Sequence, residues 1–225
     1  MTFYQTLQQS TTSERDYLLS APLIGAALNG TVSRGTYVAF LEQAYHHVAH
    51  TVPLLMAFGS RLPIELGWLR DAVVHYISEE NGHEEWILND IRASGGDPES
   101  VRNGQPALAT ELMVSTMYDR ITRINPVCML GMVFVLEGTS VALASRAAGS
   151  LAKALRLPPE AFTYLTSHGS LDQEHIVFFE RLVNRLDSVE DQRDVLHTAR
   201  VVYRLYADMF RGLPIAREEI HALAS

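Results

Sequence analysis

The chain has 225 residues, of which 47% are hydrophobic and 20% are charged, and its formal net charge at pH 7 is -8. That length is enough for one domain with a sizeable core. The acidic balance argues against nucleic acid as a partner, because phosphate binding needs a basic face. No apolar stretch suggests a membrane span and the N-terminal residues do not resemble a secretory signal, so we expect no membrane partner. The only cysteine, Cys128, excludes an intramolecular disulfide and a cysteine-rich zinc site, and it fits a reducing cytoplasm.

Helical periodicity dominates the sequence, and no run of alternating β-branched residues predicts a strand. We therefore expect an all-α, up-and-down helical bundle that forms a single domain over residues 1–225. An N-terminal part, 2–29, ends at Asn29-Gly30. Turn-forming residues then divide the chain into six long helices. They are predicted at about 33–60, 65–94, 107–124, 127–155, 158–186 and 189–211. Helices of these lengths with short connections pack as antiparallel neighbours.

The first long helix carries Glu42, His46, His47 and His50. His47 lies nearest the apolar face of this helix, whereas the other three form a separate stripe. We therefore predict that His47 is the residue of this helix that faces the interior. Each of these side chains is also compatible with an ordinary polar role.

The second long helix contains Glu80 and His83. Residues three apart project from one face of a helix, about a turn apart. A carboxylate oxygen and an imidazole nitrogen in that arrangement can bind one transition metal. The pattern is common by chance, so a solvated acidic face is the alternative interpretation.

The fourth long helix is apolar on all sides, which predicts a central position, and Glu137 is the acid within its apolar stretch. A buried carboxylate is costly unless it is paired, protonated or bound to metal. Glu137 is therefore predicted to be a metal ligand, with a buried ion pair as the alternative.

The fifth long helix carries His168, Asp172 and His175, at positions i, i+4 and i+7 of one stripe. A carboxylate between two histidines suits two neighbouring metals, although a hydrogen-bonded surface ladder is the alternative. Tyr164, one turn before His168, is a candidate hydrogen-bond or electron donor. Four apolar residues of these two helices are candidates for shaping a substrate slot, or else are plain core: Phe134, Leu136, Leu171 and Phe178.

This mixed set of oxygen and nitrogen donors suits iron, with manganese as an alternative, better than structural zinc. The order of the motifs resembles that of the haem-oxygenase-like di-metal oxidases and oxygenases, within the TenA and PqqC structural superfamily. The positions that carry the resemblance are Glu80, His83, Glu137, His168, Asp172 and His175. The first element departs from the family pattern, because His47 stands near the position where the family usually has a glutamate, and Glu42 is more than a turn away.

The resemblance implies a haem-oxygenase-like fold and two iron ions that activate dioxygen. It also implies oxidation or C–C cleavage of an amino-acid-like or fatty-acid-like small molecule. A homodimer is compatible with it. Two alternatives remain: a metal-free TenA/PqqC-like binding or interaction protein, and a ferritin-like ferroxidase. Haem oxygenase itself needs a proximal histidine near the N-terminus, and no histidine precedes His46.

Overall fold

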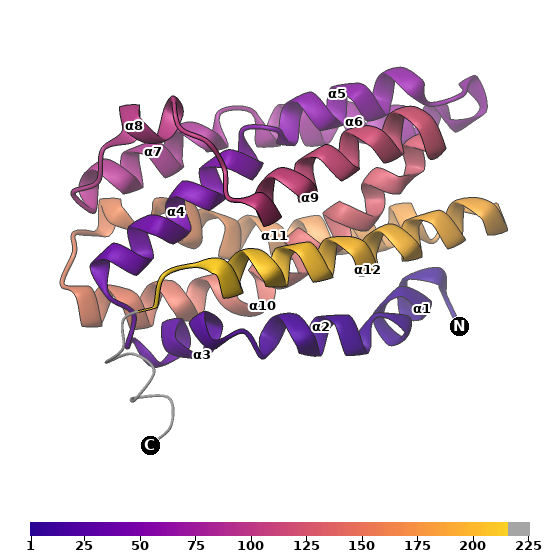
Figure 1. The fold of residues 1–225 in the computed structure, drawn as a ribbon. Coiled ribbons are helices and arrows are strands. Elements are labelled where there is room, and N and C mark those ends of the chain that lie inside the picture. Colours follow the sequence, from indigo (N-terminus) through magenta and orange to yellow (C-terminus); the bar gives the residue numbers. More distant parts are fainter. Residues whose placement is uncertain (216–225) are drawn as a thin grey trace.

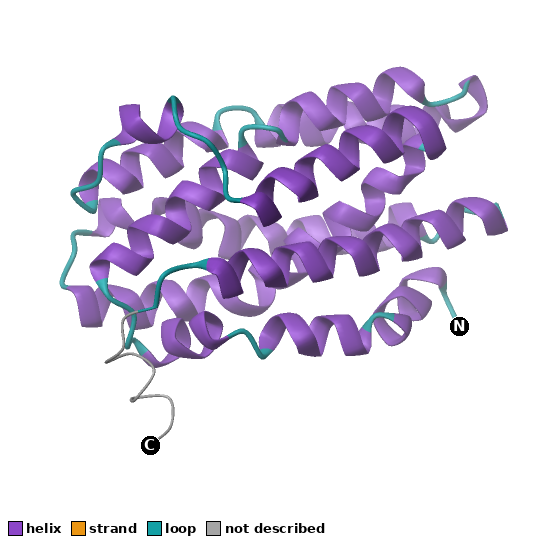
Figure 2. Cartoon of the chain, viewed as in Figure 1, coloured by secondary structure: helices purple, strands orange, loops and turns teal. Residues whose placement is uncertain are grey.

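The computed structural model describes residues 1–215, except for the side chains of residues 168–174. Within that part every regular element is a helix, so the predicted fold class is confirmed. Figure 2 shows the helices joined by short loops. The α-helices are α1 (Phe3–Ser10), α2 (Thr12–Leu19), α3 (Pro22–Asn29), α4 (Arg34–Val48), α5 (Thr51–Arg61), α6 (Gly67–Glu80), α7 (His83–Ala93), α8 (Pro98–Arg102), α9 (Leu108–Asp119), α10 (Met129–Leu155), α11 (Thr163–Val183) and α12 (Val189–Gly212). Short 3-10 turns at Ile64–Leu66, Pro126–Cys128 and Pro159–Ala161 and a π turn at Arg120–Ile124 complete the chain.

α10 is the central helix of the bundle and packs against α11, α12 and α3 (Figure 1). It approaches α12 closely at Gly131. A Cβ atom built there would lie 2.6 Å from the carbonyl oxygen of Val195 and 2.8 Å from the backbone nitrogen of Ala199. Those distances are below van der Waals contact, so glycine is needed for the two backbones to approach this closely.

Two of the predicted long helices are broken. The first is divided into α4 and α5 at Ala49-His50. Pro53 follows, and its nitrogen has no proton to donate to the carbonyl of Ala49. The second is divided into α6 and α7 at Asn81-Gly82, where Gly82 adopts a left-handed backbone with φ of +93°. Glycine adopts that conformation without the steric cost that a side chain would impose.

The other helices differ less from the prediction made from the sequence. The N-terminal part forms three short helices that run along one side of α12 in Figure 1. The third long helix ends in a π turn at residues 120–124, and α8 was not predicted. The last three predicted helices correspond to α10, α11 and α12.

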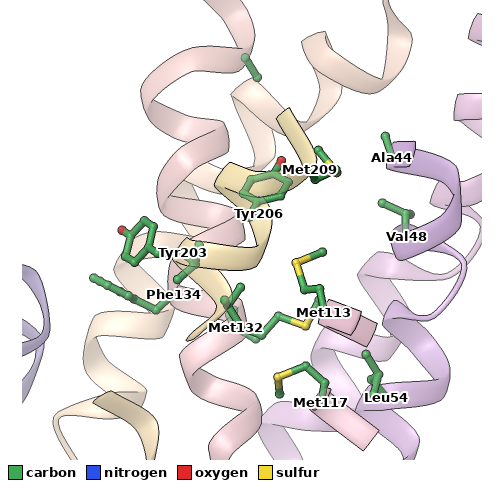
Figure 3. Close-up of a cluster of buried hydrophobic side chains, with 14 of the residues drawn as sticks. Ala44, Val48, Leu54, Met113, Met117, Met132, Phe134, Tyr203, Tyr206 and Met209 are labelled. Carbon is green, nitrogen blue, oxygen red and sulfur yellow. The ribbon is translucent and has the colours of Figure 1, made fainter. Parts of the chain in front are cut away.

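Methionines fill a large part of the core between α4, α5, α9, α10 and α12 (Figure 3). Met113 and Met117 of α9 are fully buried, and Met132 of α10 and Met209 of α12 are almost so. Flexible, unbranched methionine side chains fill irregular gaps between helices that cross at different angles. This cluster adjoins the cavity described next, which Met132 also lines.

The stretch Pro126–Leu155, which includes α10, is long and apolar enough to cross a membrane by length and composition, with a mean hydropathy of 2.0 in its most apolar window. The sequence-based statement that no stretch has this character was therefore wrong. In this structure 56% of that window is buried inside the protein. Burial by α11, α12 and α3 accounts for its apolar composition, since a core helix passes the same test.

Candidate metal centre

A cavity lies between α3, α4, α5, α6, α10, α11 and α12, and most of its lining side chains are apolar. Three residues with metal-binding side chains are part of that lining: His47 from α4, Glu80 from α6 and Glu137 from α10. Each comes from a different helix. The lining of the cavity therefore includes three of the predicted ligand positions.

Glu80 and His83 form a pair across the break between α6 and α7. The Nδ1 atom of His83 lies 3.0 Å from Oε2 of Glu80, and their side chains are 4% and 12% exposed respectively. The His83 ring stacks on Trp86 with 4.0 Å between ring centroids. The two residues are thus close, as the sequence predicted, but not as neighbours on one helical face. Glu80 ends α6 and His83 begins α7, and the left-handed turn at Gly82 brings them together.

His175 of α11 lies between two carboxylates. Its Nε2 atom is 3.0 Å from Oε2 of Glu79, and its Nδ1 atom is 3.7 Å from Oε1 of Glu137. His175 is buried, and Glu79 also lies 3.4 Å from Nε2 of the half-exposed His75. Three helices, α6, α10 and α11, meet at this histidine.

Glu79 was not among the predicted site residues. Adjacent residues on a helix point about 100° apart, so sequence analysis that placed Glu80 on the inner face left Glu79 outside it. The available signal was the tandem Glu79-Glu80 pair at the end of α6, where the helix stops and both side chains can turn toward the interior.

His47 is 2% exposed and lines the cavity, whereas His46 and His50 are only half-buried and do not. Its Nδ1 atom lies 3.1 Å from the carbonyl oxygen of Gln43. A carbonyl can only accept, so Nδ1 carries the proton and Nε2 carries the lone pair. This is the usual way in which a backbone carbonyl fixes the tautomer of a metal-binding histidine.

The other polar residues of α4 lie elsewhere. His50 lies 3.0 Å from the hydroxyl of Tyr118, and burial lowers the pKa of both His46 and His50. Glu42 is half-buried, and burial raises its pKa. The structure thus places His47, and not Glu42, at the cavity; its role as a ligand stays a prediction.

The side chains of His168, Asp172 and Leu171 lie outside the described residues. The backbone of α11 is helical through these positions and on to His175. Among the described side chains, no group of three His, Cys, Asp or Glu residues is arranged to hold a metal ion. The described donors make close contacts of an acid with a histidine, and further members of the predicted set are His47, which lines the cavity, and His168 and Asp172, whose side chains are not described.

Asp90 of α7 holds the start of α11. Its fully buried carboxylate accepts hydrogen bonds from the backbone nitrogens of Thr163, at 3.2 Å, and Tyr164, at 2.9 Å, and from the Thr163 hydroxyl. Burial raises the pKa of Asp90, and the hydrogen bonds from Thr163 and Tyr164 oppose that shift. Asp90 thereby couples α7, which begins with His83, to α11, which carries His175.

The remaining candidates divide between cavity and core. Tyr164 and Leu136 line the cavity. Phe134 packs edge to face against Tyr4 in the core. Phe178 lies against the rings of His75 and Tyr76 instead. Of these four candidates, Tyr164 and Leu136 are thus the two that are placed to touch a molecule bound in the cavity.

Comparison with known proteins identifies the class. Residues 38–207 match the family described as iron-containing redox enzymes, and the chain belongs to that family. The match covers α6, α7, α10 and α11 throughout, and α4 from Val38 onward. A comparison with curated proteins gave no match.

Solved structures show the same fold. The chain is similar to a domain of unknown function with a haem oxygenase-like fold from Shewanella denitrificans, with 23% identity, 93% of this chain and 90% of that chain covered, and a TM-score of 0.81. It is also similar to a TenA homologue from Pseudomonas syringae pv. tomato (12% identity, 92% and 90% covered, TM-score 0.74). A third is haem oxygenase-1 from the cyanobacterium Synechocystis, solved with haem (11% identity, 100% and 96% covered, TM-score 0.78). The predicted haem-oxygenase-like fold is confirmed.

Proposed function

We propose that this chain is a non-haem di-iron oxidase or oxygenase. It would use dioxygen to oxidise, or to cleave a C–C bond in, an amino-acid-like or fatty-acid-like small molecule. Membership of the iron-containing redox enzyme family supports the redox chemistry. The observation that carries the proposal is the position of His175 between Glu79 and Glu137, beside the cavity that Glu80 and His47 also border.

The residues present fit iron. Ligand atoms about 2.0–2.2 Å from one metal lie roughly 3–4 Å from each other. The His83–Glu80 distance of 3.0 Å and the His175–Glu137 distance of 3.7 Å both fall in that range. Carboxylate and imidazole donors without a thiolate suit iron or manganese. Glu80 with His83 would hold one ion and Glu137 with His175 the other, and His168, Asp172 and His47 would add to these pairs.

When bound, the two ions supply the electrons that reduce dioxygen. The chain's own residues prepare the site for them. Glu80 and Glu137 place two carboxyl groups at a mainly apolar cavity, where a bound cation would be the natural partner of buried carboxylates. The carbonyl of Gln43 fixes the tautomer of His47, and the Glu79 carboxylate lies 3.0 Å from Nε2 of His175, where the two groups interact electrostatically. The apolar walls keep water away from the substrate.

The first experiment is anaerobic titration of metal-free protein with Fe(II), followed by metal analysis. We expect about two iron ions per chain, as in two-metal sites, and consumption of dioxygen by the loaded protein. Parallel loading with Mn(II) decides between the two metals. A stoichiometry near zero after careful reconstitution would reject the proposal.

Glu137→Gln sharpens this experiment. The variant should lose iron and oxygen consumption while the metal-free protein keeps its stability, because a neutral amide is easier to bury than a carboxylate. Glu111→Gln, at an exposed position on α9, is the matched control and should behave as wild type. If Glu137→Gln instead lowers the stability of the metal-free protein by about 3–5 kcal/mol, Glu137 is a structural ion-pair partner.

A metal-free binding protein is the second candidate. The observation that favours it is that Glu80–His83 and Glu79–His175 each lie at 3.0 Å, a hydrogen-bonding distance that needs no metal. The same iron titration separates the two candidates. The ferritin-like ferroxidase loses its basis, because the chain has the haem-oxygenase-like topology.

A further inference from the structure

A line of metal-binding side chains leads from the surface of the protein to Glu137. His75 and Glu79 are one turn apart on α6, and Nε2 of His75 lies 3.4 Å from Oε2 of Glu79. The same oxygen lies 3.0 Å from Nε2 of His175, whose Nδ1 atom lies 3.7 Å from Oε1 of Glu137. Each step between neighbouring side chains is therefore no longer than 3.7 Å.

The exposure of the side chains to solvent falls along this line. His75 is 51% exposed and Glu79 is 35% exposed, whereas His175 and Glu137 are 6% and 11% exposed. The line thus begins in solvent and ends in the interior. His75, Glu79 and His175 are not among the described residues that line the cavity. The line therefore reaches Glu137 by a route that differs from the cavity.

The surface pair has two features of a cation-binding site. The His75 ring packs edge to face against Phe178 of α11, with 5.1 Å between ring centroids, so it is not free to turn away from Glu79 without losing that contact. Oε2 of Glu79 is buried and has no hydrogen-bond partner among the described residues, since a hydrogen bond needs direction as well as distance. A buried carboxylate oxygen in this situation is stabilised by a bound cation.

A metal ion that enters the protein needs donors at every step. A divalent cation that loses its water without replacement donors has a large desolvation cost. The walls of the cavity are mostly apolar, and the acidic and imidazole side chains in its described lining are those of His47, Glu80 and Glu137 themselves. Carboxylate and imidazole groups are donors that suit iron and manganese. His75 and Glu79 therefore offer an entering ion the donors that the apolar walls lack.

We propose that His75 and Glu79 form an entry site at which a divalent metal ion leaves solvent before it is transferred to His175. Nε2 of His75 and the carboxylate of Glu79 bind the ion first, with water in its remaining coordination positions. The carboxylate keeps the ion while Nε2 of His175 takes the place of Nε2 of His75, since Oε2 of Glu79 lies within 3.4 Å of both nitrogens. His175 belongs with Glu137 to the proposed metal centre, so this inference rests on the proposed function.

The physical consequence is a change in rate without a change in affinity. His75 stabilises the complex that forms during entry and not the final complex, so its removal should slow loading and release by the same factor. Loss of a residue that supports a metal site lowers metal affinity about 10–100-fold, and the loading rate falls with the population of the entry complex. We therefore expect both rates to fall at least about tenfold and the equilibrium dissociation constant to stay the same.

The experiment mixes metal-free full-length protein with Co(II) and follows loading by stopped-flow visible absorption. Release of Co(II) from the loaded protein into excess EDTA gives the reverse rate. An equilibrium titration with Co(II) gives the dissociation constant. The three quantities together separate a residue on the route of entry from a ligand of the final site.

Two variants and one control carry the test. His75→Phe removes both ring nitrogens and keeps an aromatic ring against Phe178, so it should load and release Co(II) slowly. His75→Glu supplies a carboxylate donor in place of the imidazole and should restore much of the rate. His197→Phe, at an exposed position on α12, is the matched control and should behave as wild type. Circular dichroism confirms that each variant is folded.

Loading and release at wild-type rates in His75→Phe would overturn the inference. Faster release with a weaker equilibrium affinity would also overturn it, because His75 would then be a ligand of the final site. Slow loading and release in His75→Phe, with no consumption of dioxygen by Fe(II)-loaded wild type, would reject the proposed function and leave the entry site intact. Consumption of dioxygen together with unchanged loading rates in His75→Phe would do the reverse. A wild-type protein that binds neither Co(II) nor Fe(II) at equilibrium would overturn both.

Discussion

Asp90→Ala removes the carboxylate that joins α7 to the start of α11. The substitution leaves the backbone nitrogens of Thr163 and Tyr164 without their acceptor; the Tyr164 bond is buried and the Thr163 bond is partly buried. A buried donor left without a partner costs about 1–3 kcal/mol, and loss of a helix N-terminal acceptor costs about 0.5–2 kcal/mol. The two costs overlap, because both describe the loss of the same acceptor. The substitution also removes the free-energy cost of burying the carboxylate. We expect the free energy of unfolding to fall by about 3 kcal/mol.

The assay is urea unfolding of metal-free protein followed by circular dichroism, with linear extrapolation of the free energy. Asp90→Asn keeps one acceptor oxygen and should cost about half as much. Asp71→Ala, at an exposed position on α6, should change stability by less than about 0.5 kcal/mol. A loss below about 1 kcal/mol for Asp90→Ala would refute the view that this carboxylate holds α11 against α7.

Three further predictions follow from the same structure. Burial raises the pKa of Asp90, so the native chain keeps this proton to higher pH than the unfolded chain, in which the pKa of Asp is about 3.9. Relative to Asp90→Asn, the free energy of unfolding of the wild type should therefore fall as pH rises from about 4 through the native pKa. A free energy that rose over this range would contradict the shift. Glu79→Ala should weaken iron binding about 10–100-fold by removing the carboxylate that lies 3.0 Å from Nε2 of His175, whereas Asp71→Ala should not, and an unchanged iron affinity would show that Glu79 does not help to place the ring. Gly131→Ala should destabilise the protein by about 1–3 kcal/mol in thermal or urea unfolding, because the new Cβ meets the α12 backbone, and a neutral effect would show that α10 and α12 can separate there.

Much of the fold could be predicted because residues near the start of several helices signal where those helices begin. Ser33 accepts from the nitrogen of Thr36 at the start of α4, and Pro158-Pro159 and Ser188 precede α11 and α12. These are local signals, fixed by the hydrogen-bonding and steric properties of one to four residues. They act in the same way however the helices pack against one another.

The break at Gly82 shows where local signals were insufficient. Asn81-Gly82 is a weak helix former, but a glycine within a helix costs only about 1 kcal/mol, so periodicity alone favoured a continuous helix. The break depends on interactions that sequence alone does not reveal, among them the contact of His83 with Trp86 and with Glu80. The spacing of Glu80 and His83 thus predicted their proximity, although by a different geometry from the one observed.

Asp90 and Glu79 escaped sequence analysis for a related reason. Asp90 accepts hydrogen bonds from residues more than seventy positions later in the chain, 73 for Thr163 and 74 for Tyr164. Glu79 gains its importance from His175, on a different helix. A single polar residue with a long-range partner produces no periodic pattern in the sequence. The spacing of His168, Asp172 and His175 on α11 does produce one.

α10 combines a local signal, its apolar composition, with a long-range one, the partner of Glu137 on another helix. Its composition alone is that of a membrane-crossing segment as much as that of a core helix, and length and hydropathy cannot separate the two. Glu137 separates them in this structure: its side chain, 11% exposed, lies beside His175 of α11 rather than facing an apolar phase. A buried acid in an otherwise apolar helix needs a partner on a neighbouring helix or a bound cation. Glu137, the residue on which the proposed metal centre depends, therefore lies where α11 packs against α10.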